Sequence, residues 1–379
     1  MVTGTFLRAL SCACYFFGVR LGTCIALELA VAAGAVLGAA AGVIGASRLA
    51  GDHLAAPEAR AATTAPPAIA PLPRGELRVV PPAPVPATVF GAPDAELLAP
   101  LGTAKVTRAR WNHGGTSISL RLDFENGARA AFKPVQVHLH QEPRREIAAY
   151  RLDRLLELGR VPPAKAGVIS LAEVIAGLDP SVRERVAERL RTEVQIWDGM
   201  MHGELSWWVP EITPAQIGPH LVDEPAGRGR WIAYLQVGAE IPPAVRPLVE
   251  ALSACVLFDV LTDNPDRWSG NNAVTSPDGT VFYIMDNTMT FSTARIGHER
   301  NAGILRRIQV FPRRLVQRIR ALTEDEIAEA MQGGGGETRL GPLLAPDEIR
   351  AVIHRRDHLL KYIDQLVAAH GERAVLAFP

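Results

Sequence analysis

The hydrophobic pattern of the chain changes from strand-like to helix-like partway along its length. Residues 117–124 (S-I-S-L-R-L-D-F) alternate polar and apolar positions, which predicts a half-buried β-strand. Asn126 and Gly127 form a pair favoured in hairpin turns, and residues 128–133 return as a second strand. Residues 144–158 then place apolar side chains at helical spacing. Two strands followed by a helix therefore open the folded part of the chain.

The remaining pattern predicts mostly helices. Residues 243–262 form a long apolar helix, and residues 281–285 (V-F-Y-I-M) a short buried strand. Thr323 and Glu326 have the spacing of a capping box, and residues 347–369 indicate a long C-terminal helix. A β-containing start followed by many helices predicts a two-lobed α+β fold.

The N-terminal region predicts a membrane segment. Residues 22–47 are almost wholly apolar, which is close to the ~20 residues that span a bilayer. Arg8 and Arg20 precede them, which favours a cytoplasmic N-terminus at residues 1–21 and an exported, periplasmic or lumenal C-terminal body. A cleaved signal peptide is the alternative, since residues 45–47 are small. A cytoplasmic body also stays open.

Composition separates a linker from the body. Residues 48–96 are rich in proline and alanine, so we expect an extended linker there and one domain over residues 97–379. The formal net charge of +0 argues against nucleic acid as the main partner. Of the 4 cysteines only Cys255 lies in this body, which excludes an internal disulfide framework.

The candidate chemistry is concentrated in residues 259–272 (D-V-L-T-D-N-P-D-R-W-S-G-N-N). Asp266 stands five residues before Asn271, and Asp286 follows a predicted hairpin. Phosphoryl transfer uses such a set: one carboxylate orients the attacking hydroxyl, while an amide oxygen and a second carboxylate hold divalent metals on the ATP phosphates. The spacing alone is weak evidence, because Asp and Asn are common in turns.

Joined to upstream motifs, this segment resembles the secretory-pathway kinases, the group of the Golgi casein kinase and the glycosaminoglycan xylosylkinase. The resemblance covers residues 114–370 and rests on five blocks in order: G-G-T-S-I-S-L-R-L-D-F-E-N-G-A-R-A-A-F-K-P, R-E-I-A-A-Y-R-L-D-R-L-L-E-L-G-R-V-P-P, G-E-L-S-W-W-V-P-E-I, D-N-P-D-R and I-M-D-N. It implies a protein-kinase-like fold with a small β-containing N-lobe and a mostly helical C-lobe. It also implies ATP-dependent phosphotransfer with Mn²⁺ or Mg²⁺.

The resemblance assigns expected roles to individual residues. Lys133 is similar to the N-lobe lysine that contacts the ATP phosphates, and Glu146 to the helix glutamate that orients this lysine and reaches the metal. Asp266 resembles the catalytic base. Asp286 and Asn271 resemble the metal ligands, although relatives of the Golgi casein kinase carry an acidic residue in place of this asparagine.

Other loop residues are expected to support the site. Gly114, Gly115 and Thr116 are the candidates for backbone contacts to phosphates, in a loop weaker than a full G-x-G-x-x-G motif. Asn264 and Arg267 are expected to brace the catalytic loop rather than react.

Some features depart from the group or carry less weight. Residues 288–291 (T-M-T-F) stand where relatives carry glycines, and the body lacks the cysteines of animal members, which suits a divergent bacterial branch. His138 and His140 are expected to be solvated rather than to bind metal. Trp207 and Trp208 are expected to pack between the lobes rather than to form a sugar platform.

The sequence leaves several functions open. The leading hypothesis is a membrane-anchored kinase that phosphorylates a hydroxyl of a protein Ser/Thr or of a sugar. The first alternative is a pseudokinase that binds nucleotide or regulates a partner, which the departure at Thr288 and Met289 motivates. A phosphoinositide-kinase-like enzyme is the second, because D-R-x-x-x-N also occurs there. The oligomeric state is not predicted.

Overall fold

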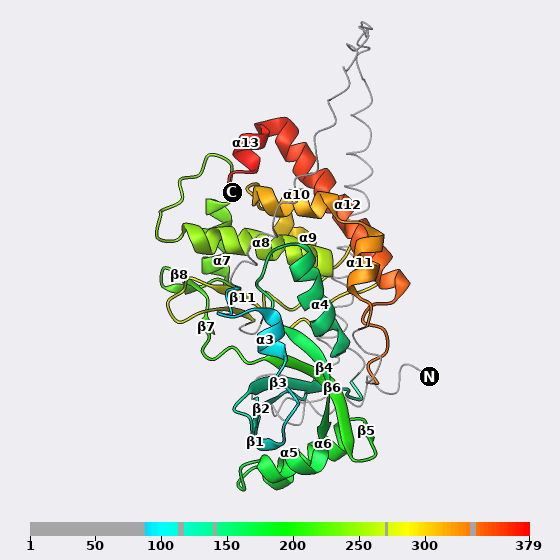
Figure 1. The fold of residues 1–379 in the computed structure, drawn as a ribbon. Helices are drawn as coiled ribbons and strands as arrows, with labels where there is room; N and C mark the ends of the chain where they lie inside the picture. Colours follow the sequence, from blue (N-terminus) through cyan, green and yellow to red (C-terminus); the bar gives the residue numbers. More distant parts are fainter. Residues whose placement is uncertain (1–87, 113–116, 139–141, 270–271, 334–338) are drawn as a thin grey trace, which may run out of the picture. The chain divides into compact units, whose positions relative to one another are not determined.

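The computed structural model describes residues 88–112, 117–138, 142–269, 272–333 and 339–379 (Figure 1). The elements of its first part are α3 (Asp94–Leu98), β1 (Val106–Trp111), β2 (Leu120–Phe124), β3 (Arg129–Pro134), α4 (Arg144–Leu155), β4 (Ala164–Ser170), α5 (Leu171–Gly177), α6 (Arg183–Glu193), β5 (Ile196–Trp197) and β6 (Met200–Trp207). The second part contains β7 (Thr213–Pro214), β8 (Gln216–Ile217), β9 (His220–Leu221), α7 (Pro225–Tyr234), α8 (Arg246–Thr262), β10 (Ala273–Thr275), β11 (Phe282–Ile284), α9 (Glu299–Leu305), α10 (Arg313–Ala321), α11 (Glu324–Ala330), α12 (Pro346–His370) and α13 (Glu372–Val375). This β-containing part followed by a helical part confirms the predicted two-lobed α+β arrangement.

The first lobe is built on an antiparallel sheet with strand order β1-β2-β3-β6-β4, and β5 pairs with β6 at its side. The predicted hairpin is confirmed as β2 and β3, which pair from Leu120↔Phe132 to Asp123↔Arg129. Its turn is closed by Gly127, which has a φ of 82°. The strands β1, β4 and β6 were not predicted, and β6 is the strand that joins the hairpin to β4.

Strands β3 and β6 approach so closely that only glycine fits at position 203. A Cβ there would lie 2.4 Å from the carbonyl oxygen of Lys133 and 2.8 Å from the Cα of Pro134. This close approach fixes the backbone of Lys133 against β6. The register pairs Lys133 directly with Glu204.

The second lobe packs around α8, whose last eleven residues are all buried. The predicted apolar helix over residues 243–262 is therefore confirmed, with its first turn at Arg246. The predicted C-terminal helix is confirmed as α12, which packs against α8 (Figure 1). The capping box of Thr323 and Glu326 is also present. Helix α8 carries the chain to Asp263, which ends it with a left-handed φ of 59°.

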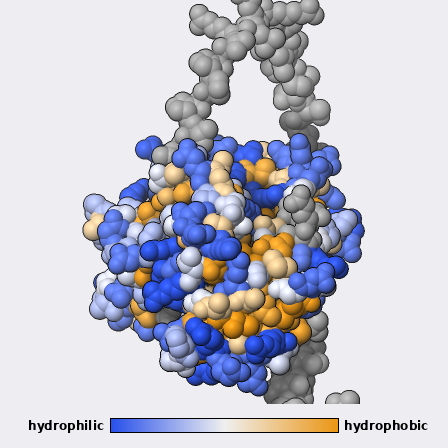
Figure 2. All heavy atoms as spheres, turned by 60° about the horizontal axis from the view of Figure 1, so that its bottom comes forward, coloured by the Kyte–Doolittle hydropathy of each residue, from blue (hydrophilic) through white to orange (hydrophobic). Residues whose placement is uncertain are grey.

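The surface seen in Figure 2 mixes hydrophilic and hydrophobic side chains. Among the described residues, the exposed large hydrophobic side chains are those of Val89, Val137, Ile212 and Ile296. The short segment before the sheet is held in place, because Phe90 is buried against Trp207 and Tyr283. Phe90 thus forms an aromatic cluster with Trp207 of β6 in the first lobe and Tyr283 of β11 in the second.

The predicted single-pass membrane localisation is corrected. In the part of the chain that the structure describes, no helix combines the length and the apolar character needed to cross a bilayer. The segment on which the prediction rested, residues 22–47, lies outside the described residues.

Candidate functional site

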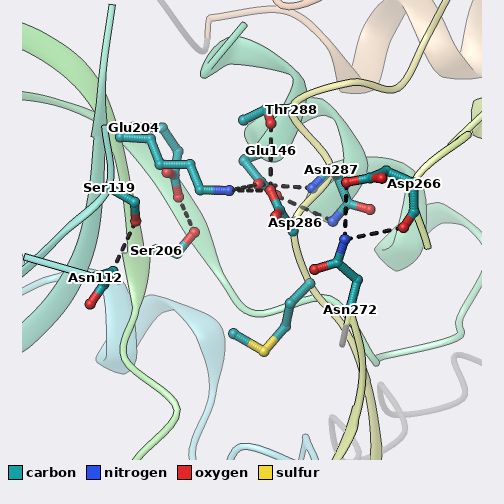
Figure 3. Close-up of polar contacts among 12 residues, drawn as sticks. Asn112, Ser119, Glu146, Glu204, Ser206, Asp266, Asn272, Asp286, Asn287 and Thr288 are labelled. Atoms are coloured by element: carbon teal, nitrogen blue, oxygen red, sulfur yellow. Dashed lines mark hydrogen bonds and ion pairs between the residues drawn. The ribbon is translucent and has the colours of Figure 1, made fainter. Parts of the chain in front are cut away.

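Three elements bring Lys133, Glu146 and Asp286 together. Lys133 lies one residue before the end of strand β3, Glu146 lies in the first turn of α4, and Asp286 follows β11. The ammonium Nζ of Lys133 lies 2.5 Å from Oε1 of Glu146 and 2.7 Å from Oδ1 of Asp286 (Figure 3). Thirteen and 153 residues of chain separate the members of these two pairs, so only the tertiary fold creates the cluster.

The electrostatics of the cluster favour charged forms of the lysine and the aspartate. Burial alone lowers the pKa of Lys133, but the negative charges of Asp286 and Glu146 outweigh it and raise that pKa above its ordinary value. The charge of Lys133 lowers the pKa of Asp286. The side chain of Asp286 is 47% exposed against 13% for Lys133, so the aspartate is the member that faces solvent.

Asn287 links Glu146 to the loop that carries Asp286. Its backbone N–H donates to Oε1 of Glu146 at 2.8 Å, and its Nδ2 donates to Oε2 at 3.2 Å. The side chain is fully buried, and its Oδ1 accepts from Nη2 of Arg267 at 2.8 Å. Asn287 was not among the site residues predicted from the sequence. Its position directly after Asp286 was the available signal.

The loop after α8 presents Asp266. Oδ1 of Asp266 accepts from the hydroxyl of Ser269 at 2.5 Å. Its Oδ2 accepts from Nδ2 of Asn272 at 3.1 Å (Figure 3). Each oxygen therefore has capacity for a further hydrogen bond. Asn272 was not predicted as a site residue, because the five-residue spacing from Asp266 favoured its neighbour Asn271.

Asn264 and Arg267 hold the two loops together. Oδ1 of Asn264 accepts from the backbone N–H of Asp266 at 3.0 Å, while its Nδ2 donates to the carbonyl of Asp286 at 3.3 Å. Arg267 is fully buried and donates to Asp259 at 3.3 Å and to the carbonyl of Met285. Asp266 and Asp286 are thus fixed to one shared frame.

The segment that departs from the group is ordered around the same frame. Thr288 is buried, and its hydroxyl lies 3.5 Å from Oδ1 of Asp286. The hydroxyl of Thr290 donates to the carbonyl of Asn287 at 2.6 Å, and Phe291 is buried with a φ of 55°. Residues larger than glycine therefore fit here without displacing Asp286 from Lys133.

Several predicted residues lie outside the described ones, and others have local partners. Gly114, Gly115, Thr116, Asn271 and His140 are not described, so their expected roles stay predictions. His138 lies 3.4 Å from Glu193. Trp207 packs edge-on against Phe90, and Trp208 lies under the guanidinium of Arg121.

The carboxylates fit a divalent cation that is bound together with phosphate. Asp286 and Glu146 offer oxygen atoms on either side of one ammonium, and oxygen is the ligand type that Mg²⁺ and Mn²⁺ prefer. No group of three or more His, Cys, Asp or Glu in a metal-binding arrangement occurs within the described part of the chain. A metal held through one or two carboxylates and the phosphates of a nucleotide does not require such a group.

The sequence of the chain is similar to those of characterised kinases and a pseudokinase. It is 22% identical to the glycosaminoglycan xylosylkinase of Danio rerio, over 74% of this chain and 77% of the relative. It is 22% identical to the pseudokinase FAM20A of Mus musculus, over 69% of this chain and 56% of the relative. No family model matches the chain. The glycosaminoglycan xylosylkinase and FAM20A are thus among the homologues of this chain.

Solved structures of this group share the fold. The chain superimposes on the Golgi casein kinase with a TM-score of 0.59 and 17% identity, over 75% of this chain and 77% of the other. A structure of the same kinase with Mn/ADP bound gives a TM-score of 0.57 and 16% identity, over 75% and 78%. These matches confirm the kinase-like fold. The predicted bacterial origin stays a prediction.

Proposed function

We propose that the chain is an ATP-dependent phosphotransferase that moves the γ-phosphoryl group to a hydroxyl acceptor, with its catalytic body in residues 97–379. The observation that carries this proposal is the contact of Lys133 with both Glu146 and Asp286, next to the loop that holds Asp266. A homologue with bound Mn/ADP supports ATP with Mn²⁺ as the cofactors. Mg²⁺ is an alternative that the same oxygen ligands accept.

The side chains of the cluster divide the work of binding the metal and the nucleotide. Lys133 donates from its ammonium group to phosphate oxygens, and Glu146 keeps this ammonium at the end of β3. Asp286 and Glu146 are the carboxylates that would hold a divalent cation. The bound metal–nucleotide supplies the phosphoryl group and neutralises charge that develops on its oxygens.

Asp266 acts on the acceptor. Its carboxylate accepts the proton of the attacking hydroxyl as the new O–P bond forms and the bond from the γ-phosphorus to ADP breaks. Ser269 and Asn272 each occupy one oxygen of Asp266, so the carboxylate is held in a fixed orientation when the acceptor arrives. An acceptor hydroxyl of a protein or of a sugar meets the same requirement.

A pseudokinase is the second candidate, because FAM20A is among the relatives and Thr288 borders the metal-binding aspartate. A regulatory module of this kind retains the fold and loses transfer. The presence of Lys133, Glu146, Asp266 and Asp286 in one arrangement favours the active enzyme.

Transfer of label from γ-labelled ATP tests the proposal. The full chain is incubated with Mn²⁺ or Mg²⁺ and, in separate reactions, with an acidic-motif protein, with a xylose-bearing glycan and alone. We expect label on one acceptor with the wild type and none with Asp266→Ala, while both bind ATP equally. ATP binding without transfer to any acceptor would favour the pseudokinase. Equal transfer by Asp266→Ala would overturn the assignment of the base.

A further inference from the structure

Glu204 is a buried carboxyl group directly beside the proposed site. Strands β3 and β6 pair Lys133 with Glu204, and residues that pair across two strands project from the same face of a sheet. Glu204 is 1% exposed. Figure 3 shows the carboxyl group of Glu204 beside Ser206 and apart from Asp286. Glu204 stands in the motif G-E-L-S-W-W-V-P-E-I, and no role was predicted for it from the sequence.

Glu204 has a different partner from the other two carboxylates. The ammonium of Lys133 contacts Glu146 and Asp286, whereas the hydrogen bond to Glu204 comes from the hydroxyl of Ser206. Within the described residues, no Lys, Arg or His forms an ion pair with Glu204. Burial and the negative charge of Glu146 raise the pKa of Glu204 well above its ordinary value. Three carboxyl groups therefore surround a single ammonium.

A divalent cation changes this balance. It would take oxygen atoms of Glu146 and Asp286, and these include the atoms that lie 2.5 and 2.7 Å from Nζ of Lys133. The cation also repels the ammonium at this short range. The ammonium of Lys133 therefore needs another negatively charged acceptor in place of the oxygen atoms that the cation takes. A lysine carries its charge on a flexible four-carbon stem, so a small rotation redirects it.

We propose that Glu204 is a positioning residue that supplies this replacement: it accepts a hydrogen bond from Lys133 when a divalent cation occupies Glu146 and Asp286. This inference rests on the proposed function, because it assumes that these two carboxylates hold the metal. Glu204 lies opposite Lys133 and on the same face of the sheet. Lys133 can therefore move its hydrogen bond to Glu204 without any movement of the strands. Once it pairs with the ammonium, its ionised form is stabilised.

A double-mutant cycle tests whether Glu204 acts through Lys133. Binding of Mn²⁺ alone is measured by electron paramagnetic resonance for the full-length wild type, Glu204→Gln, Lys133→Met and the double variant. We expect Glu204→Gln to weaken Mn²⁺ binding about tenfold, the order of one charge-assisted hydrogen bond. In the Lys133→Met background the same change is expected to alter binding by less than about twofold, because the ammonium is gone.

Two controls distinguish the positioning role of Glu204 from a loss of folding and from the loss of one negative charge anywhere on the protein. Glu211→Gln removes an equal charge from an exposed position, and we expect it to leave Mn²⁺ binding unchanged. Thermal unfolding checks that Glu204→Gln is folded; if it is not, Glu204→Met, which has no polar group to leave unpaired, repeats the cycle.

The possible outcomes distinguish a failure of this inference from a failure of the proposed metal site. An equal effect of Glu204→Gln in both backgrounds would mean that the glutamate acts on the metal without the lysine, which overturns the inference. No effect in either background would also overturn it. Failure of the wild type to bind Mn²⁺ would instead overturn the proposed metal site, and the inference with it.

Discussion

Replacing Gly203 with alanine tests how the sheet fixes Lys133. The new Cβ would lie 2.4 Å from the carbonyl oxygen of Lys133, 2.7 Å from Cε2 of Phe132 and 2.8 Å from the Cα of Pro134. Ordinary contact distances are about 3.5 Å, so β3 and β6 must separate by roughly 1 Å. Two of the three atoms are backbone, which no rotamer change can move aside.

The separation has a cost in stability and a cost in function. Overpacking in a well-packed interior costs about 1–3 kcal/mol, and we expect the upper half of this range because the clash is with backbone. The shift moves Lys133, whose ammonium now lies 2.5 Å from Glu146 and 2.7 Å from Asp286. A displacement of roughly 1 Å at a reacting centre lowers turnover by about a hundredfold.

Urea unfolding measures the first effect, and the rate of label transfer from γ-labelled ATP measures the second. Gly229→Ala is the matched control, since Gly229 lies within α7 with no atom close to its absent Cβ. That substitution is expected to stabilise the protein by about 0.5–1 kcal/mol through helix propensity. The reasoning is refuted if the free energy of unfolding of Gly203→Ala lies within about 0.5 kcal/mol of the wild type, the usual range of surface substitutions, and its rate of label transfer is unchanged.

The other predictions concern the charged residues. Lys133→Met is expected to weaken binding of Mn·ATP about tenfold with little change in unfolding midpoint, and unchanged affinity in calorimetry would remove the lysine from its phosphate role. Asp286→Ala, like chelation of the metal by EDTA, is expected to abolish label transfer; metal-stimulated transfer by the variant would contradict the ligand assignment. Burial raises the pKa of Asp153 from 3.8 to about 6. The folded protein therefore holds this proton more tightly than the unfolded chain does. The contribution of Asp153 to the free energy of unfolding is fully present below pH 3.8 and is lost as pH rises through about 6. The unfolding free energy of the wild type minus that of Asp153→Asn is expected to fall by about 3 kcal/mol from pH 2 to pH 7, and a flat difference would refute this.

The predicted elements that the structure confirms are those with local causes. The turn at Asn126 and Gly127 closes on itself, since Phe124 and Ala128 hydrogen-bond across it at 2.9 Å. Helix α8 is long and apolar, and the capping box at Thr323 uses only residues within one turn. Each of these signals is complete within a few consecutive positions, so the sequence shows it directly.

Strand β6 shows why other elements could not be predicted. Its sequence, M-M-H-G-E-L-S-W, carries a histidine, a glycine and a glutamate, which weaken any strand pattern. It is a central strand because β3 and β4 pair with its two edges, and those partners lie far away in the sequence. The need for glycine at position 203 arises only because the carbonyl of Lys133 approaches it in the folded sheet.

The sequence by itself determined the order of motifs and the residue types of the chemistry: a lysine after a hairpin, a glutamate in the next helix, and Asp266 and Asp286 around a short hairpin. The tertiary structure decided which of these side chains touch. Contacts such as those of Lys133 with Asp286, separated by 153 residues, depend on how two lobes close on each other. It also decided that Glu204 is buried beside this cluster. Burial and charge are properties of the surroundings, and a residue acquires its surroundings only when the chain has folded.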